Sequence, residues 1–338
     1  MGARSTGNHP TTTKADGHLL EYFRQTFVAG GGGTNTSNVL SGLTASGGVI
    51  SDYTSGDTVY RAHVFTSSGT FDVSAIGDYS DTVEYLVVAG AGGGGGGYYG
   101  GGGGAGGVRT NLSGHPLATG NPSFSVPTTG GNGSGSYTVT IGGGGVGGYY
   151  PGGNATNNGN DGGQGVDSYF GPPSIPAGIT AKGGGRGLGR ATSVGSPRAG
   201  YPGGSGGGIG YNGPAVGYGY NPSTPAPIVP NIPSPHPYGI TQGYPGGPAP
   251  NNTTYGSSGG GAGGPGAIGG GPLAHGADGG AGAQILIAGP PTTSGVGAPG
   301  PGGGLQWFAG GGAGGGGGTN HPDRYLSLIH ISEPTRPY

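Results

Sequence analysis

The chain has 338 residues, among them 96 Gly and 30 Pro, with 11 basic and 13 acidic residues and a formal net charge of −2. Gly and Pro exceed one third of the chain without a strict Gly-X-Y period, a composition typical of low complexity. Disordered chains usually stay soluble through charge, which this chain lacks, so plain disorder fits poorly. The scattered basic residues also exclude the electrostatic surface expected of a nucleic-acid binder.

Residues 1–18 are polar, contain no apolar stretch of the kind found in secretory signals, and are predicted to be flexible. No apolar run approaches the length of a membrane span, so we expect a soluble protein without membrane insertion. Cysteine is absent, which excludes disulfides and thiolate metal sites.

Residues 19–48 form a possible attachment segment. Leu20, Tyr22, Phe23 and Phe27 lie in the short apolar stretch GHLLEYFRQTFV, which is too short to bury much surface by itself. Two interpretations of this stretch remain open. It could dock on another protein, or it could pack as a strand or turn on its own domain.

Residues 49–89 carry the clearest β pattern and are predicted to form a small clamp. The segments 58–65 and 70–73 are separated by SSG, which predicts a hairpin between them. Residues 83–88 are apolar except at Glu84 and predict a central strand. The segments 136–142 and 283–289 are two further candidate strands, so the prediction is one small sheet-based core.

Residues 90–318 are dominated by glycine runs with Tyr, Pro and Asn connectors between them. The runs cover 90–107, 142–148, 183–189, 203–210, 256–271, 276–282, 295–304 and 310–318. Amphipathic helix patterns and heptads are almost absent from this part of the sequence.

Three interpretations compete for VEYLVVAGAGGGGGGYYGGGGGAGG at 83–107. A dinucleotide-binding loop would match G-x-G-x-x-G at 90–95. That motif needs a following helix and an acidic residue roughly 20 positions later, and none comes before Asp161. A flexible linker explains one run but not eight, because linkers need domains to join. The third interpretation is a bundle of polyglycine II helices.

Polyglycine II is an extended left-handed helix with three residues per turn and no internal hydrogen bonds. Its N–H and C=O groups point sideways and must find neighbours, which packed glycine runs supply to one another. Ordering so much glycine is costly, so such a bundle must pack cooperatively and be held at one end, by the β clamp. Ala262, Pro265 and Ile268 are three residues apart and are predicted to point outward.

The segments GHLLEYFRQTF, YRAHVFTSSGTFDV, VEYLVVAGAGGGGGG and GGAGGVRTNLSGHPL resemble glycine-rich tail proteins of marine tailed bacteriophages. The likeness covers most of residues 17–318 and is mainly compositional after residue 150. A related family, the tip adhesins on long tail fibres of myophages, folds glycine runs into a polyglycine II sandwich whose distal loops recognise bacterial receptors. The resemblance implies a virion appendage protein. The long Pro-Tyr connector 211–255 departs from the pattern, as an enlarged loop or an insert.

The sequence offers no catalytic or metal-binding pattern, and we predict neither an enzyme nor a cofactor. The eight histidines lie far apart without ligand spacing, and no Ser/His/Asp arrangement is present. GGQGVDSYF at 162–170 matches one calcium β-roll repeat, but such sites need tandem copies, so we interpret it as a strand.

Tyrosines lie between or beside the glycine runs, and they are the candidate receptor-binding residues. They could cover the outside of the bundle. Alternatively they could form a binding rim, because Tyr together with Ser, Gly and Asn is enriched in the binding loops of antibodies. The predicted site residues are Tyr98, Tyr99, Tyr149, Tyr150, Tyr211, Tyr218, Tyr220, Tyr244 and Tyr255.

Together these features predict an all-β, irregular fold: a small β-sheet clamp with a polyglycine II bundle joined by variable loops. The expected function is a tail fibre or tip adhesin, located in the virion outside the host cell. The expected partners are a bacterial surface glycan or outer-membrane protein and other tail fibre subunits. The alternatives are a purely structural fibre or matrix protein and an ice-binding bundle, although scattered Tyr and Pro disfavour a flat ice-binding face.

Residues 319–338 form a tail in which glycine stops. LSLIHISEPTR within 326–338 matches the translation of a common sequencing adaptor, so we expect assembly read-through from a metagenomic source.

Overall fold

The computed structural model describes residues 42–55, 58–76, 81–97, 99–125, 135–149, 159–172, 178–190, 203–210, 242–247, 255–269, 276–291, 296–300 and 304–316. Within these ranges the chain consists of short β-strands and irregular extended segments, apart from one 3-10 turn at Pro116–Ala118. No helix in the described ranges has the length and apolar character needed to cross a bilayer. The predicted all-β, irregular class is confirmed.

The main sheet has five antiparallel strands in the order β1-β4-β9-β10-β11. Their bounds are β1 Thr44–Ser46, β4 Gly69–Ala75, β9 Ser136–Thr140, β10 Ser168–Gly171 and β11 Ile179–Ala181. The strand predicted within 136–142 is therefore present. Because three of the five strands lie beyond residue 90, the sheet and the glycine runs alternate along the chain.

The hairpin expected between residues 58–65 and 70–73 is wrong. β3, Thr58–Val64, pairs with β2, Val49–Ser55, in a separate two-stranded ribbon, whereas β4 pairs with β1 and β9. Alternate residues of β4, Phe71 and Val73, are buried in the core, and their burial favours the place of β4 in the main sheet.

The single central strand expected at 83–88 is also wrong, because it is interrupted at Glu84 and Tyr85. β5, Thr82–Val83, pairs with β8, Phe124–Ser125, and β6, Leu86–Val88, pairs with β7, Val108–Thr110.

The Asn111 side chain supplies the hydrogen bonds at this break. The Tyr85 N–H donates to Asn111 Oδ1 at 2.7 Å, and Asn111 Nδ2 donates to the Val83 carbonyl at 2.9 Å. An amide side chain thus takes the place of a neighbouring strand.

A second amide side chain shortens the strand expected at 283–289. Only Ala283–Gln284, β12, is a strand, and it pairs with β13, Trp307–Phe308. Beyond it, Gln306 Oε1 accepts from the Ala288 N–H, while Gln306 Nε2 donates to the carbonyls of Gly289 and Pro290.

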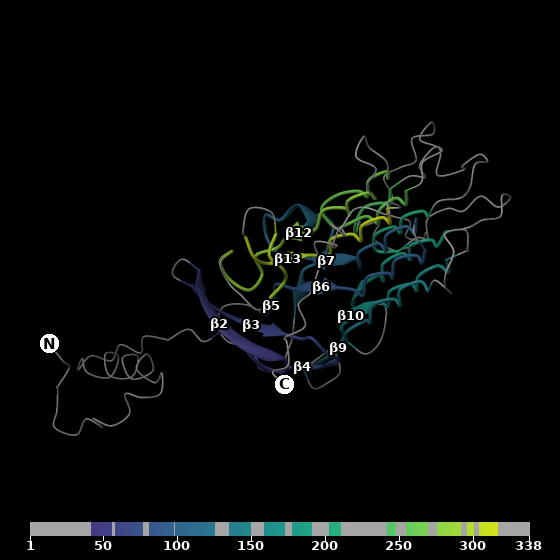
Figure 1. Cartoon of the computed structure of the whole chain (residues 1–338). Helices are drawn as coiled ribbons and strands as arrows, with labels where there is room; N and C mark the ends of the chain where they lie inside the picture. The colour runs from purple at the N-terminus through teal and green to yellow at the C-terminus, as the bar shows by residue number, and fades with distance from the viewer. Residues whose placement is uncertain are drawn as a thin grey trace, which may run out of the picture.

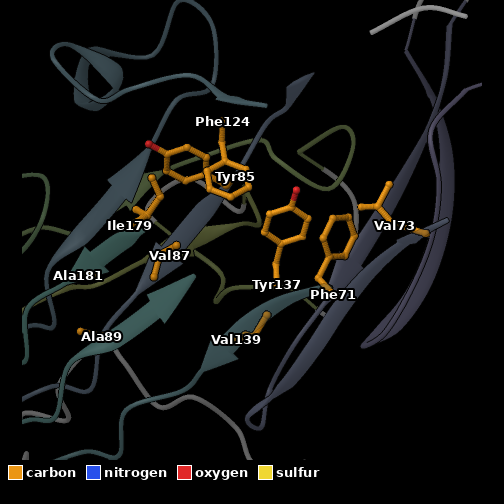
Figure 2. Close-up of a cluster of buried hydrophobic side chains, with 11 residues drawn as sticks. Phe71, Val73, Tyr85, Val87, Ala89, Phe124, Tyr137, Val139, Ile179 and Ala181 are labelled. Atoms are coloured by element: carbon orange, nitrogen blue, oxygen red, sulfur yellow. The ribbon is translucent and has the colours of Figure 1, made fainter. Parts of the chain in front are cut away.

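Figure 2 shows the aromatic core over the main sheet, in which the side chains of Phe71, Tyr85, Phe124 and Tyr137 converge. The rings of Phe124 and Tyr137 meet edge to face at 5.4 Å. The Tyr85 hydroxyl donates to the Pro122 carbonyl at 3.0 Å, and burial raises the pKa of Tyr85 to about 12. Aromatic burial is thus the main apolar stabilisation of the clamp.

The glycine runs continue from the strands as extended segments that lie side by side (Figure 1). β6 leads into 89–97 and 100–107 leads back into β7; β9 leads into 142–149, 159–167 leads into β10, and β11 leads into 182–190. The strands therefore set the starting positions of neighbouring runs, although the clamp predicted at 49–89 contains only β4 of the main sheet.

Hydrogen bonds between the runs recur every third residue. The N–H groups of Gly90, Gly93 and Gly96 donate to the carbonyls of Val166, Gly163 and Asn160 at 3.0, 2.8 and 2.8 Å. In the same run Gly92 and Gly95 donate to a different neighbour, at Gly104 and Gly101. A helix with three residues per turn produces this pattern, because successive residues face different neighbours. The runs are thus packed as polyglycine II helices.

The outward position predicted for Ala262 is wrong, whereas Pro265 and Ile268 are exposed. Ala262 is fully buried in a small cluster with Val108 and Ile285. The chain reverses just after it, since the Gly261 N–H donates to the Gly264 carbonyl at 2.9 Å. The three residues therefore do not lie on one straight helix.

Candidate functional site

The run 100–107 lies inside the bundle and bonds to several neighbours in turn. The N–H groups of Gly101 and Gly104 donate to Leu188 and Gly185, both at 2.8 Å. Those of Gly102 and Ala105 donate to Ser257 and Gly260, both at 2.9 Å. Since each face of this run is bonded to another segment, the inner part of the bundle forms a scaffold whose backbone groups are satisfied internally.

Ala105, Leu188 and Ser257 are buried within this scaffold, but many of its glycine positions leave no room for a side chain. A Cβ added at Gly92 would lie 2.2 Å from the Gly185 carbonyl oxygen, and one at Gly104 would lie 2.4 Å from the Ser205 oxygen. The obstructing atoms are backbone atoms, which cannot rotate away. Side chains that recognise a partner must therefore come from the ends and the outside of the bundle.

The phosphate-binding interpretation of 90–95 also fails on geometry. A phosphate loop needs backbone N–H groups directed at the ligand. Here the N–H groups of Gly90, Gly92 and Gly95 already donate to carbonyls of neighbouring runs.

Gly97 and Gly100 connect the run that leaves β6 to the run that returns to β7, and the Gly100 N–H donates to the Gly97 carbonyl. They therefore lie at the end of the bundle away from these strands, which we call the free end; Figure 1 shows the runs extending away from the strands. The Arg190 N–H donates to Gly96, and Gly96 donates to Asn160. The Gly315 N–H donates to Gly100 and the Gly256 N–H to Gly315, at 2.7 and 2.8 Å. The free end comprises Gly96, Gly97, Tyr99, Gly100, Tyr149, Gly159, Asn160, Arg190, Tyr255, Gly256 and Gly315.

Three of the predicted tyrosines share this free end. Tyr99 lies in the turn, the Tyr149 carbonyl accepts from the Asn160 N–H at 3.0 Å, and Tyr255 forms an antiparallel bridge with Gly316. Tyr244 lies closer to the sheet, where its N–H donates to the Gly261 carbonyl. The remaining predicted residues, Tyr98, Tyr150, Tyr211, Tyr218 and Tyr220, lie outside the described residues.

The three tyrosines of the free end differ in exposure. Tyr149 is 67% exposed, whereas Tyr99 and Tyr255 are half-buried. The guanidinium carbon of Arg190 lies 5.0 Å from the centre of the Tyr99 ring, within cation–π distance. Tyr99 is thus held in place, while Tyr149 presents its ring to solvent.

Charged residues near the free end were missed in the sequence reasoning. Asp161 Oδ1 accepts from the Gly189 N–H at 2.9 Å, and Asp161 Oδ2 lies 3.7 Å from the Arg186 guanidinium. The sequence feature that could have predicted them is the pair Arg186 and Arg190 in the otherwise uncharged stretch GGGRGLGR. The free end therefore combines tyrosine rings with the Arg190 guanidinium group.

The GGQGVDSYF segment, expected as a strand, is divided between a glycine run at 162–167 and β10. Asp167 has structural partners, because its carboxylate lies 2.6 Å from Lys182 Nζ and accepts from the Gly183 N–H at 2.8 Å. In the part of the chain that the structure describes, no three His, Asp or Glu side chains are grouped as metal ligands would be.

No curated protein and no solved structure gives a significant match to the chain. A family model described as a glycine-rich domain matches residues 66–326, which is well over half of the sequence. These residues include most of the main sheet and the glycine runs. The protein therefore belongs to the glycine-rich domain family.

Proposed function

We propose that the protein is a tail appendage protein of a tailed bacteriophage, a tail fibre or tip adhesin that binds a receptor on a bacterial surface. The observation that carries the proposal is the grouping of Tyr99, Tyr149 and Tyr255 at the free end of the bundle. The receptor would be a surface glycan or an outer-membrane protein, and other tail fibre subunits would be further partners.

The physical support is the contrast between a satisfied scaffold and the side chains at its end. Glycine helices cannot discriminate between partners, so specificity depends on residues that interrupt the runs. Tyrosine buries a large area at low entropic cost, and a preorganised scaffold reduces the ordering cost of binding. The exposed Tyr149 ring suits stacking on an apolar sugar face, and Arg190 beside Tyr99 suits hydrogen bonding to hydroxyl or anionic groups.

The experiment compares binding of labelled protein to a panel of bacterial isolates and to a glycan array. Replacing both Tyr99 and Tyr149 by Ala is expected to lower binding by at least about tenfold, or about 1.4 kcal/mol, without changing the melting temperature by more than a few degrees. Tyr60→Ala is the matched control, because Tyr60 is 41% exposed on β3, away from the free end. Equal binding by all three proteins would contradict a receptor site at the free end.

A purely structural fibre role is the second candidate, favoured by the open edge of the bundle. At Gly143 and Gly147 an added Cβ would meet no atom within 4 Å, so this run has an uncovered side. A structural fibre would grow by lateral association of such edges. Filaments in electron micrographs at low protein concentration, with no binding to any isolate, would establish that role instead.

A further inference from the structure

The β2–β3 ribbon exposes more apolar surface than a stable element of its size should. Val49, Ile50, Val59 and Tyr60 are 68%, 47%, 71% and 41% exposed. Isolated two-stranded hairpins are marginally stable in water, and large apolar residues gathered on one short element usually mark a contact surface. The ribbon lies at the opposite side of the molecule from the free end (Figure 1).

One face of this ribbon is more open than the other. The strand register places on it Ile50, Asp52, Thr54, Val59, Arg61 and His63, and all of them except His63 are exposed. At its centre Arg61 donates to both carboxylate oxygens of Asp52, each at 2.8 Å. The other face carries Val49 and Tyr60, and there the Tyr53 hydroxyl reaches the Ile287 carbonyl at 3.2 Å. On the first face only His63, at one end, contacts the body, with its ring 5.1 Å from that of Phe71. We call the first set the open ribbon face.

The chain itself supplies an apolar segment close to this face. The described chain begins at Gly42, directly before β1, and Gly47 and Gly48 join β1 to β2. Thirteen residues, 29–41, separate residue 28 from Gly42, and this stretch spans up to about 50 Å when extended. The ribbon, at seven residues per strand, is about 23 Å long. The segment 19–28 can therefore reach every part of the open ribbon face.

The composition of this segment matches the face. Leu20, Phe23 and Phe27 provide apolar side chains for Ile50 and Val59. Glu21 and Arg24 provide one charge of each sign, complementary to Arg61 and Asp52.

A tethered segment is favoured over a second copy of the chain by the size of the face. Stable complexes between separate chains use about 20–30 residues on each side, whereas the open ribbon face has six. A tether raises the local concentration of a segment to the millimolar range, so a small contact suffices. We propose that residues 19–28 dock on the open ribbon face and cover Ile50 and Val59.

The test uses the absence of cysteine from the natural sequence. In the full chain, Gln25→Cys combined with Thr54→Cys places one thiol in the segment and one on the open ribbon face. A disulfide requires the two Cα atoms to lie within about 7 Å. Under mild oxidation at low protein concentration we expect an intramolecular disulfide, at least about tenfold faster than for Gln25→Cys with Ile268→Cys.

Replacing apolar residues of the segment by serine then tests whether docking, and not the tether alone, sets the rate of disulfide formation. Adding Phe23→Ser and Phe27→Ser to the first cysteine pair should slow disulfide formation about tenfold, because docking, and not chain proximity, sets the local concentration. Adding Val146→Ser, at a distant residue that is 76% exposed, should leave the rate unchanged. An unchanged rate with the two Phe substitutions would overturn the proposal. Disulfide-linked dimers formed by the single variant Thr54→Cys would overturn it too, in favour of a second copy as the occupant.

Discussion

At single positions, glycine in the packed runs is required by the distance to the neighbouring backbone. A Cβ at Gly261 would lie 2.1 Å from the Ala281 oxygen and 2.5 Å from the Gly280 oxygen. Gly261→Ala is therefore expected to lower the free energy of unfolding by at least about 1–3 kcal/mol, as overpacking does, and Gly261→Val by more. Urea denaturation measures the change.

Gly147→Ala is the matched control for this prediction. Gly147 lies on the outer run, and a Cβ there would meet nothing within 4 Å. Alanine should stabilise the protein by about 0.4–1 kcal/mol, because it restricts the unfolded chain. Equal effects of the two alanines would mean that neighbouring runs are not packed at Gly261.

A buried glutamine is a second residue whose role depends on the neighbouring backbone. Gln242 is 1% exposed, and its Oε1 accepts from the Lys182 N–H at 2.8 Å, at the point where β11 leads into a glycine run. Gln242→Met keeps the volume but leaves that N–H without its acceptor, which should cost about 1–3 kcal/mol. Thermal unfolding tests this value, and an unchanged melting temperature would contradict it.

The core tyrosines give the stability a dependence on high pH. The pKa of Tyr85 is raised to about 12 by burial, from an ordinary value of 10.0, so the folded state favours the neutral phenol. Its contribution is fully present below pH 10 and is lost as the pH rises through about 12. Burial also raises the pKa values of Tyr137 and Tyr169.

Urea unfolding between pH 9 and 12 should therefore show falling stability, with Tyr85 contributing up to about 1.4 kcal/mol per pH unit. Tyr85→Phe should make this fall in stability less steep, and Tyr137 and Tyr169, whose pKa values are also raised, should keep part of it. An identical slope in the variant would exclude Tyr85 as its source.

At the scale of one element, the outer run 142–149 should show amide exchange with a period of three. The N–H groups of Gly142, Gly145 and Gly148 donate to Ser168 Oγ, Ala91 and Gly94. Those of Gly144 and Gly147 have no acceptor among the described residues. Residue-resolved hydrogen exchange should therefore find the first three amides slow and the last two fast. Uniformly fast exchange along the run would contradict polyglycine II packing.

At the scale of the whole molecule, the alternation of strands and glycine runs makes the core and the bundle one cooperative unit. Phe124 is buried in the aromatic core, and its ring lies 4.6 Å from that of Phe170 on β10. Phe124→Ala should destabilise the protein by about 3–5 kcal/mol.

The same substitution should lower the exchange protection of Gly93 and Gly104, because the sheet holds the ends of their runs. The fluorescence of Trp307, the single tryptophan, should change in the same transition. Two separate transitions, with the glycine amides unaffected by Phe124→Ala, would show that the bundle is stable without the clamp.

The local sequence pattern was enough to predict the fold class and that the bundle consists of polyglycine II helices. Glycine runs interrupted by aromatic connectors, low charge and short β segments indicate an all-β clamp with polyglycine II helices. β9 was found from the pattern of SYTVT, and the three-residue period of the runs follows from backbone geometry without side chains. Tyr99, Tyr149 and Tyr255 were selected because they stand beside runs.

Only the tertiary structure decided which segments are neighbours. β3 pairs with β2 because β4 is buried in the main sheet, and Asn111 interrupts the strand expected at 83–88. Tyr244 lies apart from Tyr99, Tyr149 and Tyr255 because its run bonds at Gly261, nearer the sheet. The physical reason is that polyglycine II helices and strands take their hydrogen bonds from segments distant in sequence. The local sequence pattern therefore determines the period of the hydrogen bonds along a run. Which segment accepts each hydrogen bond is determined by the packing of the whole chain.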